Sequence, residues 1–250
     1  VMNVGGMVDT SWFKEDDQIS SVLMAWQGGM EGGLAAADVL CGDVNPSGKL
    51  VDTFAASLED YPSTENFHES VYYVDYTEDI YVGYRYFETL PGAAEKVNYP
   101  FGYGLSYTEF QIRVPEPENG SIEKDGKIQI PVQVTNTGNK AGKEVVQVYY
   151  GAPQGKLGKP AKVLGAYGKT RLLLPGETQL MKLSFAVADM ASYDDKNAKA
   201  YVLEAGDYEI SLRTDSHTVV DTKTYTIDET VTYGEDNARS TDETAATNQL

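Results

Sequence analysis

The feature that most constrains this fold is an alternation of apolar and polar residues in the second half of the chain. Apolar side chains occupy every second position of residues 127–136. A period of two predicts strands that bury one face, and clusters of Gly, Pro and Asn at 136–139 and 175–177 predict the turns between them. Further strands are predicted over residues 144–150, 162–174, 178–187, 199–203, 207–213 and 218–227. About seven strands within about 115 residues predict an antiparallel β-sandwich.

The beginning of the chain has a different pattern, typical of a parallel sheet that is covered on both faces. Residues 1–4 and 21–26 are short apolar runs without alternation, and residues 49–54 form a third. An Ala-rich segment over 31–40 predicts a helix, with Gly42 as its C-terminal stop. Strand, helix and strand within about 35 residues predict a parallel α/β sheet.

These patterns divide the chain into three parts. We expect an α/β unit over 1–110 and an immunoglobulin-like or fibronectin type III-like β-sandwich over 111–227. The segment 228–250 is acidic, Thr-rich and nearly without large aliphatic residues, which predicts a linker or arm. The expected fold class is therefore α/β plus all-β.

Charge is concentrated in the first part. Residues 1–115 carry 18 acidic and 5 basic side chains, whereas the whole chain has a net charge of −18. A strongly negative surface repels phosphate backbones and anionic lipids. In addition, no run approaches the roughly 18 to 20 apolar residues of a transmembrane helix. We therefore expect no nucleic-acid and no membrane partner, whereas a neutral ligand such as a sugar is allowed.

Side chains suited to metal binding are scarce. Cys41 is the single cysteine, and its apolar surroundings predict a buried side chain. His68 and His217 lie in separate polar segments and lack the His-x-x-x-His spacing of a helical metal site. The chain also lacks a phosphate-binding Gly-rich loop and a Gly-x-Ser-x-Gly nucleophile motif. We expect no metal and no cofactor.

Carboxylates remain as candidates for chemistry, because glycoside hydrolysis uses two of them across one bond. Several lie in predicted loops or at element ends: Asp9, Glu31, Asp75, Glu78 and Asp79. In a chain this acidic, carboxylates fall in loops and at element ends by chance. Composition alone therefore selects none of these five as catalytic.

Aromatic residues and glycines are dense in 80–87 and 99–110, and the acidic segment 55–80 between the predicted units also contains several tyrosines. An aromatic ring beside a glycine can stack on the apolar face of a sugar. It can equally dock one domain on another, and docking is the favoured interpretation. The long irregular segment 55–80 is typical of a functional loop.

Several blocks of the sequence occur together in one order: 22–33, 37–40, 42–50, 80–87 and 100–107, followed by 134–138, 141–149 and 174–177. The first five resemble glycoside hydrolase family 3, the β-glucosidase and β-xylosidase group. The last three resemble the fibronectin III-like domain of that family. The resemblance implies that residues 1–110 are the C-terminal part of a parallel α/β sandwich domain.

The resemblance also implies an activity. Family members combine a (β/α)₈ barrel, an α/β sandwich domain and a β-sandwich, and they release β-linked sugar from non-reducing ends with retention. Their nucleophile is an Asp of the barrel, and their acid/base Glu lies in a loop that precedes the strand at which this chain begins. We therefore expect no catalytic residue within 1–250.

The expected partners are a β-linked oligosaccharide or aryl glycoside and the remainder of the parent enzyme. The unpatterned segment after Ile227 leads us to expect the barrel downstream of Leu250. Oligomeric state stays open and a homo-oligomer is allowed. One free cysteine and no visible export signal favour the cytoplasm. A non-catalytic carbohydrate-binding or structural module is the alternative function.

Six residues are candidates for substrate binding. Asp9, Trp12 and Glu31 follow predicted parallel strands, whose carboxyl ends present ligands in open α/β sheets. Tyr72, Tyr73 and Asp75 lie in the acidic loop and would reach the aglycone side. The alternatives are a core or domain-interface role for Trp12, a role at the helix N-terminus for Glu31 and a solvent-facing loop for the other three.

Overall fold

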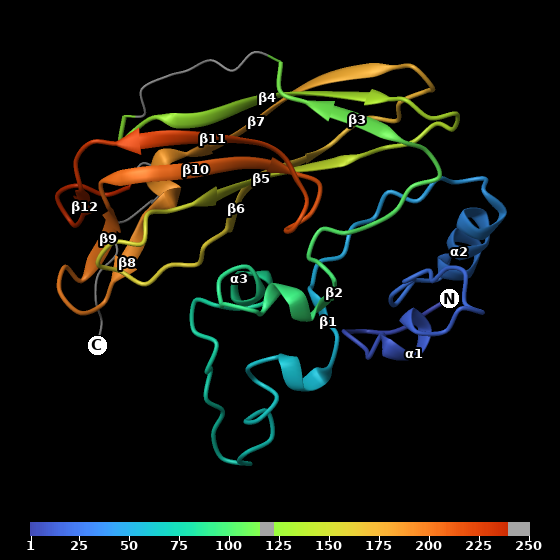
Figure 1. Cartoon of the computed structure of the whole chain (residues 1–250), viewed down its shortest axis with the longest axis horizontal. Coiled ribbons are helices and arrows are strands. Elements are labelled where there is room, and N and C mark those ends of the chain that lie inside the picture. The colour runs from blue at the N-terminus through green and yellow to red at the C-terminus, as the bar shows by residue number, and fades with distance from the viewer. Residues whose placement is uncertain (116–122, 240–250) are drawn as a thin grey trace.

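The computed structural model describes residues 1–115 and 123–239. Figure 1 shows a β-rich part, from β3 onward, and a sparser part that curves below it and to its right. Within the described ranges, no helix has the length and apolar character needed to cross a membrane.

The β-rich part is a sandwich of two antiparallel sheets. One sheet has the order β3-β4-β7 and the other β11-β10-β5-β6. The strands are β3 (Phe110–Arg113), β4 (Lys127–Asn136), β5 (Val145–Gly151), β6 (Val163–Lys169), β7 (Thr178–Ala186), β10 (Gly206–Arg213) and β11 (Val219–Ile227). Along β4 the apolar positions are buried in alternation, and Val132 and Val134 are fully buried in the core between the sheets. The predicted fibronectin type III-like sandwich is confirmed.

A small third sheet closes one end of the sandwich. It consists of β8 (Ser192–Asp194), β9 (Ala200–Leu203) and β12 (Val231–Tyr233), in the order β12-β9-β8. Tyr233 is 2% exposed and belongs to the core, and its hydroxyl donates to the Lys124 carbonyl at 3.2 Å. The acidic segment 228–250 thus begins with a short strand that packs on the sandwich; its last residues, 240–250, lie outside the described part.

The first part has shorter elements than predicted. Its helices are α1 (Ser11–Lys14), α2 (Gly32–Cys41) and α3 (Tyr84–Phe87), with 3₁₀ turns η1 (Leu58–Asp60) and η2 (Ala94–Lys96). Helix α2 agrees with the predicted helix, and Gly42 ends it with a φ of 82°. However, no residue of α2 is buried, so Cys41 is exposed and the prediction of a buried thiol is wrong.

The predicted parallel sheet is reduced to a single contact. Met2 and Met24 form an isolated parallel bridge, in which the Met2 N–H donates to the Leu23 carbonyl at 2.8 Å. The third predicted strand, over 49–54, is wrong in extent and in direction: of these residues only Phe54 lies in a strand, β1 (Phe54–Ala55), which pairs antiparallel with β2 (Val97–Tyr99). Parallel strands are stable when neighbouring strands and helices cover them, and the described residues provide only two short segments here.

Candidate functional site

The aromatic and glycine-rich blocks meet the sandwich in a seam, which we define as the contact between residues 45–110 and the strands and turns of the sandwich. Tyr84 of α3 stacks on Phe101 with ring centroids 4.8 Å apart and meets the edge of Tyr149 of β5 at 5.7 Å. The Leu164 N–H of β6 donates to the Tyr84 hydroxyl oxygen at 2.9 Å. The favoured interpretation of these blocks as a docking element agrees with this geometry.

Gly102 allows the closest approach in the seam. Its φ is 85°, a left-handed conformation that favours glycine, and a Cβ there would lie 2.4 Å from Gln147 Nε2. Gln147 is itself fixed, since its Nε2 donates to the Thr214 carbonyl at 2.7 Å and its Oε1 accepts from the Tyr149 hydroxyl at 2.7 Å. Burial holds the pKa of Tyr149 far above its ordinary value, so this phenol remains a neutral donor.

Polar contacts hold the other end of the seam. Lys49 Nζ lies 2.8 Å from Glu144 Oε1, and both side chains are mostly buried. Asn45 Oδ1 accepts from the Tyr107 N–H at 2.8 Å and from Ser106 Oγ at 3.0 Å. The segment that leads into β3 is therefore bound to the loop after α2.

Asp9 and Trp12 lie together at the start of α1. The Ser11 N–H and hydroxyl donate to Asp9 Oδ1 at 2.8 and 2.7 Å, and these bonds lower the pKa of the Asp9 carboxyl. A carboxylate held ionised in this way is a poor proton donor. Trp12 is 53% exposed and meets the edge of Phe13 at 5.0 Å, so within the described chain it is not a core residue.

Glu31 precedes α2 at its N-cap position. Its side chain is exposed and makes no capping hydrogen bond, while its carbonyl accepts from the Ala35 N–H at 2.9 Å. Glu31 thus contributes to the helix start through its backbone only.

The other three candidates lie elsewhere, on the loop that extends below α3 in Figure 1. Tyr72 is 94% and Tyr73 55% exposed, and the Asp75 carbonyl accepts from Asn66 Nδ2 at 2.9 Å. In this view the loop lies well apart from α1, so the structure divides the six candidates into at least two groups.

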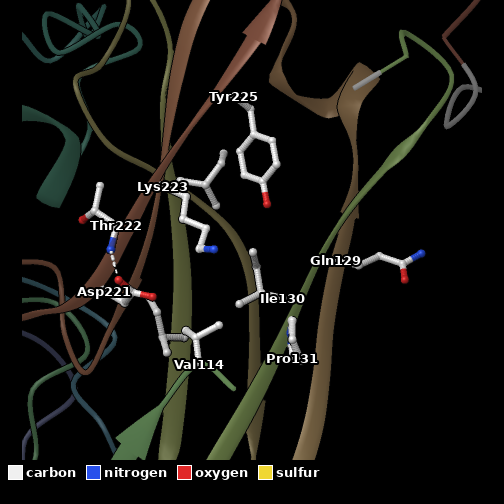
Figure 2. Close-up of a pocket in the computed structure, with 10 residues that line it drawn as sticks. Val114, Gln129, Ile130, Pro131, Asp221, Thr222, Lys223 and Tyr225 are labelled. Atoms are coloured by element: carbon white, nitrogen blue, oxygen red, sulfur yellow. Dashed lines mark hydrogen bonds between the residues drawn. The ribbon is translucent and has the colours of Figure 1, made fainter. Parts of the chain in front are cut away.

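Two hollows among the described residues are lined by other side chains than these candidates. One, of about 10 Å³, lies between β4 and β11 and is lined by Val114, Ile130 and Tyr225 (Figure 2). It has room for roughly one water molecule. An open hollow of about 500 Å³ lies where residues 106–109 meet residues 137–139. Over the described ranges, no cluster of His, Cys, Asp and Glu is arranged to hold a metal ion.

The described residues thus form an α/β element that is bound through the seam to a fibronectin type III-like sandwich. Residues 1–107 match the glycosyl hydrolase family 3 C-terminal domain and residues 144–216 the fibronectin type III-like domain. The chain belongs to glycosyl hydrolase family 3.

Similar proteins of known name support membership in this family. The chain is 66% identical to beta-glucosidase A of Butyrivibrio fibrisolvens over 86% of its own length and 28% of that protein. It is 45% identical to a beta-glucosidase of Ruminococcus albus over 92% of this chain and 24% of that protein. The chain thus spans about a quarter of the length of these curated relatives.

Solved structures agree with the fold. A beta-glucosidase from Paenibacillus barengoltzii has a TM-score of 0.86 and 48% identity, covering 92% of this chain and 26% of that one. Beta-glucosidase 3B from Thermotoga neapolitana, solved in complex with α-D-glucose, has a TM-score of 0.82 and 39% identity, covering 92% and 31%.

Sequence reasoning missed one feature of the seam. It considered His217 only as a metal ligand, whereas His217 Nε2 lies 2.8 Å from Glu88 Oε1 across the seam. No local pattern links these two positions. The sequence feature that could have pointed to this pair is the position of Glu88, directly after the aromatic block 80–87 that was expected to dock.

Proposed function

We propose that this chain is part of a retaining β-glycosidase of the β-glucosidase kind, which releases β-linked sugar from non-reducing ends. The observation that carries the proposal is the 66% identity to a named beta-glucosidase over 229 residues. Both catalytic carboxylates lie outside residues 1–250. Retaining cleavage requires two carboxyl groups about 5 to 5.5 Å apart, and the candidate carboxylates Asp9, Glu31 and Asp75 are all exposed.

The role of the chain in that enzyme is to form one wall of the sugar cleft and to brace it. Residues 1–110 form the wall, residues 111–227 the brace, and residues 228–250 an arm. The exposed apolar side chains on and around α2 support docking of the remainder of the parent enzyme, which includes a barrel. Among them, Met30 is 99%, Leu34 65% and Leu40 60% exposed. An apolar patch of this kind is typical of a surface that another part of a protein covers.

Substrate would meet the chain at two places. Asp9, Trp12 and Glu31 would support or line the cleft beside the missing acid/base loop. Tyr72, Tyr73 and Asp75 would contact the aglycone of a β-linked oligosaccharide or aryl glycoside. The exposed Tyr72 ring supports this assignment, because an exposed aromatic face stacks readily on a sugar or an aryl group.

A chromogenic β-glucoside assay tests the placement of the catalytic groups. The 250-residue chain should show no turnover above background, whereas the parent enzyme should be active. Substantial turnover by the chain that is abolished by Glu31→Gln would overturn the proposal. Asp38→Asn, which changes a carboxylate within α2 itself, is the matched control.

The alternative is a non-catalytic carbohydrate-binding module, favoured by the exposed tyrosines of the acidic loop. This alternative predicts micromolar affinity for a β-linked oligosaccharide in the 250-residue chain alone, and the enzyme-fragment proposal predicts almost none. Isothermal calorimetry with cellobiose and a matched Tyr72→Ala variant separates the two.

A further inference from the structure

One ion pair in the seam joins α3 to the sandwich. Glu88, at the C-terminal end of α3, places its Oε1 2.8 Å from Nε2 of His217, which lies in the turn between β10 and β11. The Glu88 side chain is 10% and the His217 side chain 30% exposed. A carboxylate this well buried depends on its partner, because an unpaired buried charge is costly.

The neighbouring seam contacts of α3 are neutral. The Ala161 N–H donates to Thr89 Oγ1 at 2.8 Å, and the Ser216 N–H donates to the Phe101 carbonyl at 2.9 Å. The second charged contact of the seam joins Lys49 to Glu144 and contains no histidine, the side chain that ordinarily changes charge near neutral pH. The pair of Glu88 and His217 is therefore the described seam contact that changes charge near neutral pH.

Three charged groups act on the imidazole from the elements packed around it. The Glu88 carboxylate, in contact with the imidazole, raises the pKa of His217, and Asp215 acts in the same direction. Burial and the Arg213 guanidinium oppose this increase. From α3, Arg85 lies with its guanidinium 5.9 Å from the Tyr84 ring, and its Nε has no hydrogen-bond partner.

The turn that carries His217 is rigid. Asp215 Oδ1 accepts from the His217 and Thr218 N–H groups at 2.8 and 2.7 Å, and Asp215 is 6% exposed. Arg213 donates through Nε to Ser211 Oγ at 2.8 Å. Since the turn cannot follow a displaced partner, weakening of the pair loosens α3 from the sandwich.

We propose that Glu88 and His217 form a protonation-dependent latch that seats α3 on the sandwich and so positions the acidic loop 55–80. The loop ends shortly before α3, so motion of α3 moves its C-terminal anchor. When the imidazole is charged, Glu88 is compensated and the latch is closed. When the imidazole is neutral, it no longer compensates the carboxylates of Glu88 and Asp215 that lie beside it. The latch therefore loosens.

The direction of the pH dependence follows from the sign of the shift. Because the pKa of His217 is raised in the folded chain, the latch is fully closed below the ordinary histidine pKa of about 6.5. It opens as the pH rises through the higher value of the folded state. Glu88 and His217 act here as positioning residues and have no contact with substrate.

The imidazole of His217 provides a direct test. In an NMR titration, we expect His217 to titrate above the ordinary histidine pKa of about 6.5, and we expect Glu88→Gln to lower that value. If His217 in the unaltered chain titrates at or below about 6.5, the proposal is wrong.

Hydrogen exchange tests the mechanical step. The N–H groups of Ala161 and Leu164 bond to the α3 region, so their protection reports its seating. Protection is first corrected for the intrinsic pH dependence of exchange. We then expect the protection of these two N–H groups to fall about tenfold as His217 loses its proton. In Glu88→Gln we expect their protection to be independent of pH. Equal pH profiles in both proteins would overturn the latch.

A control and a second variant complete the design. The control is Glu177→Gln, which alters an exposed ion pair with Arg171 that belongs to the sandwich alone and not to the seam. This variant should leave the pH profile of exchange protection unchanged. His217→Gln should abolish the pH dependence in the same way as Glu88→Gln. The profile of the unaltered chain is decisive even if a variant fails to fold, and none of these measurements uses hydrolysis, so they are independent of the proposed enzymatic function.

Discussion

The side-chain amide of Asn45 donates to the carbonyl of Ala141, 96 positions further along the chain, at 3.0 Å. The Ala141 carbonyl belongs to the loop between β4 and β5, so Asn45 is one of the side chains that join the loop after α2 to the sandwich. Gly142 provides the space, because a Cβ there would lie 2.7 Å from Asn45 Nδ2. The contact helps to hold residues 1–110 on the β-sandwich.

Replacing Asn45 by Ala should therefore lower the free energy of unfolding. The change removes one donor and leaves the Tyr107 N–H and the Ser106 hydroxyl without their acceptor, at a cost of about 1 to 3 kcal/mol. Urea denaturation measures it. Asn139→Ala, in an exposed loop position, is the control and should change stability by less than about 0.5 kcal/mol. Equal losses in the two variants would contradict the assigned role of Asn45.

Gly102→Ala should destabilise the chain. The new methyl group meets Gln147, which cannot move aside because its amide is bonded on both sides, and φ is positive as well. We expect a loss of about 2 to 4 kcal/mol in chemical denaturation. Gly33→Ala, in α2 with open space at its Cβ, should instead stabilise by about 0.5 to 1 kcal/mol. A neutral Gly102→Ala would show that the seam is looser than its geometry indicates.

A buried ion pair inside the sandwich gives a third prediction. Lys159, 2% exposed, donates to Glu204 and, at 2.9 Å, to the Pro153 carbonyl. Lys159→Met leaves the Glu204 carboxylate uncompensated and should cost about 3 to 5 kcal/mol in thermal or urea unfolding. Arg171→Met breaks an exposed pair instead and should cause little change.

Glu204 also makes acid stability predictable. Burial alone would raise the pKa of its carboxyl, but the bonds from Lys159 and from the Lys156 and Leu157 N–H groups together lower it. A carboxyl with a lowered pKa stabilises the fold above its ordinary value of about 4.3 and loses that effect as the pH falls through the folded-state value. Unfolding followed below pH ~4.5 should therefore show a shallower acid transition in Lys159→Met than in the unaltered chain; identical slopes would argue against this pair as a cause.

The exposed apolar residues of α2 should govern self-association of the chain. Leu34→Glu replaces a side chain that is 65% exposed, so the unfolding free energy should change by less than about 0.5 kcal/mol while sedimentation shows less association. Leu173→Ala, at a fully buried position, should cost about 2 to 5 kcal/mol. A large loss of stability in Leu34→Glu would mean that α2 packs against the chain itself.

The sandwich was predictable because its information is local. In β4 each side chain alternates between core and solvent, and the turns between strands carry their own Gly and Pro signals, so periodicity alone locates the strands. β12 escaped prediction because a three-residue strand is too short to show a period. Tyr233 belongs to the core through a contact with Lys124, far away in the sequence.

The first part and the seam were less predictable for the opposite reason. Apolar runs such as 21–26 indicate burial but not what buries them, and the described residues supply a single parallel bridge for them. The pairing of Glu88 with His217 depends on how α3 meets the turn after β10, which no spacing encodes. The positions of the six candidate site residues relative to substrate stay predictions for the same reason.

The buried phenol of Tyr149 gives the molecule a built-in optical reporter. Burial raises the pKa of Tyr150 to about 12 and that of Tyr149 and Tyr208 further still. In an alkaline absorbance titration, the phenolate signal of these buried rings is delayed until the seam opens at Tyr149 and the sheets separate at Tyr208. The size of that delayed step measures, without any label, how much of the sandwich has come apart.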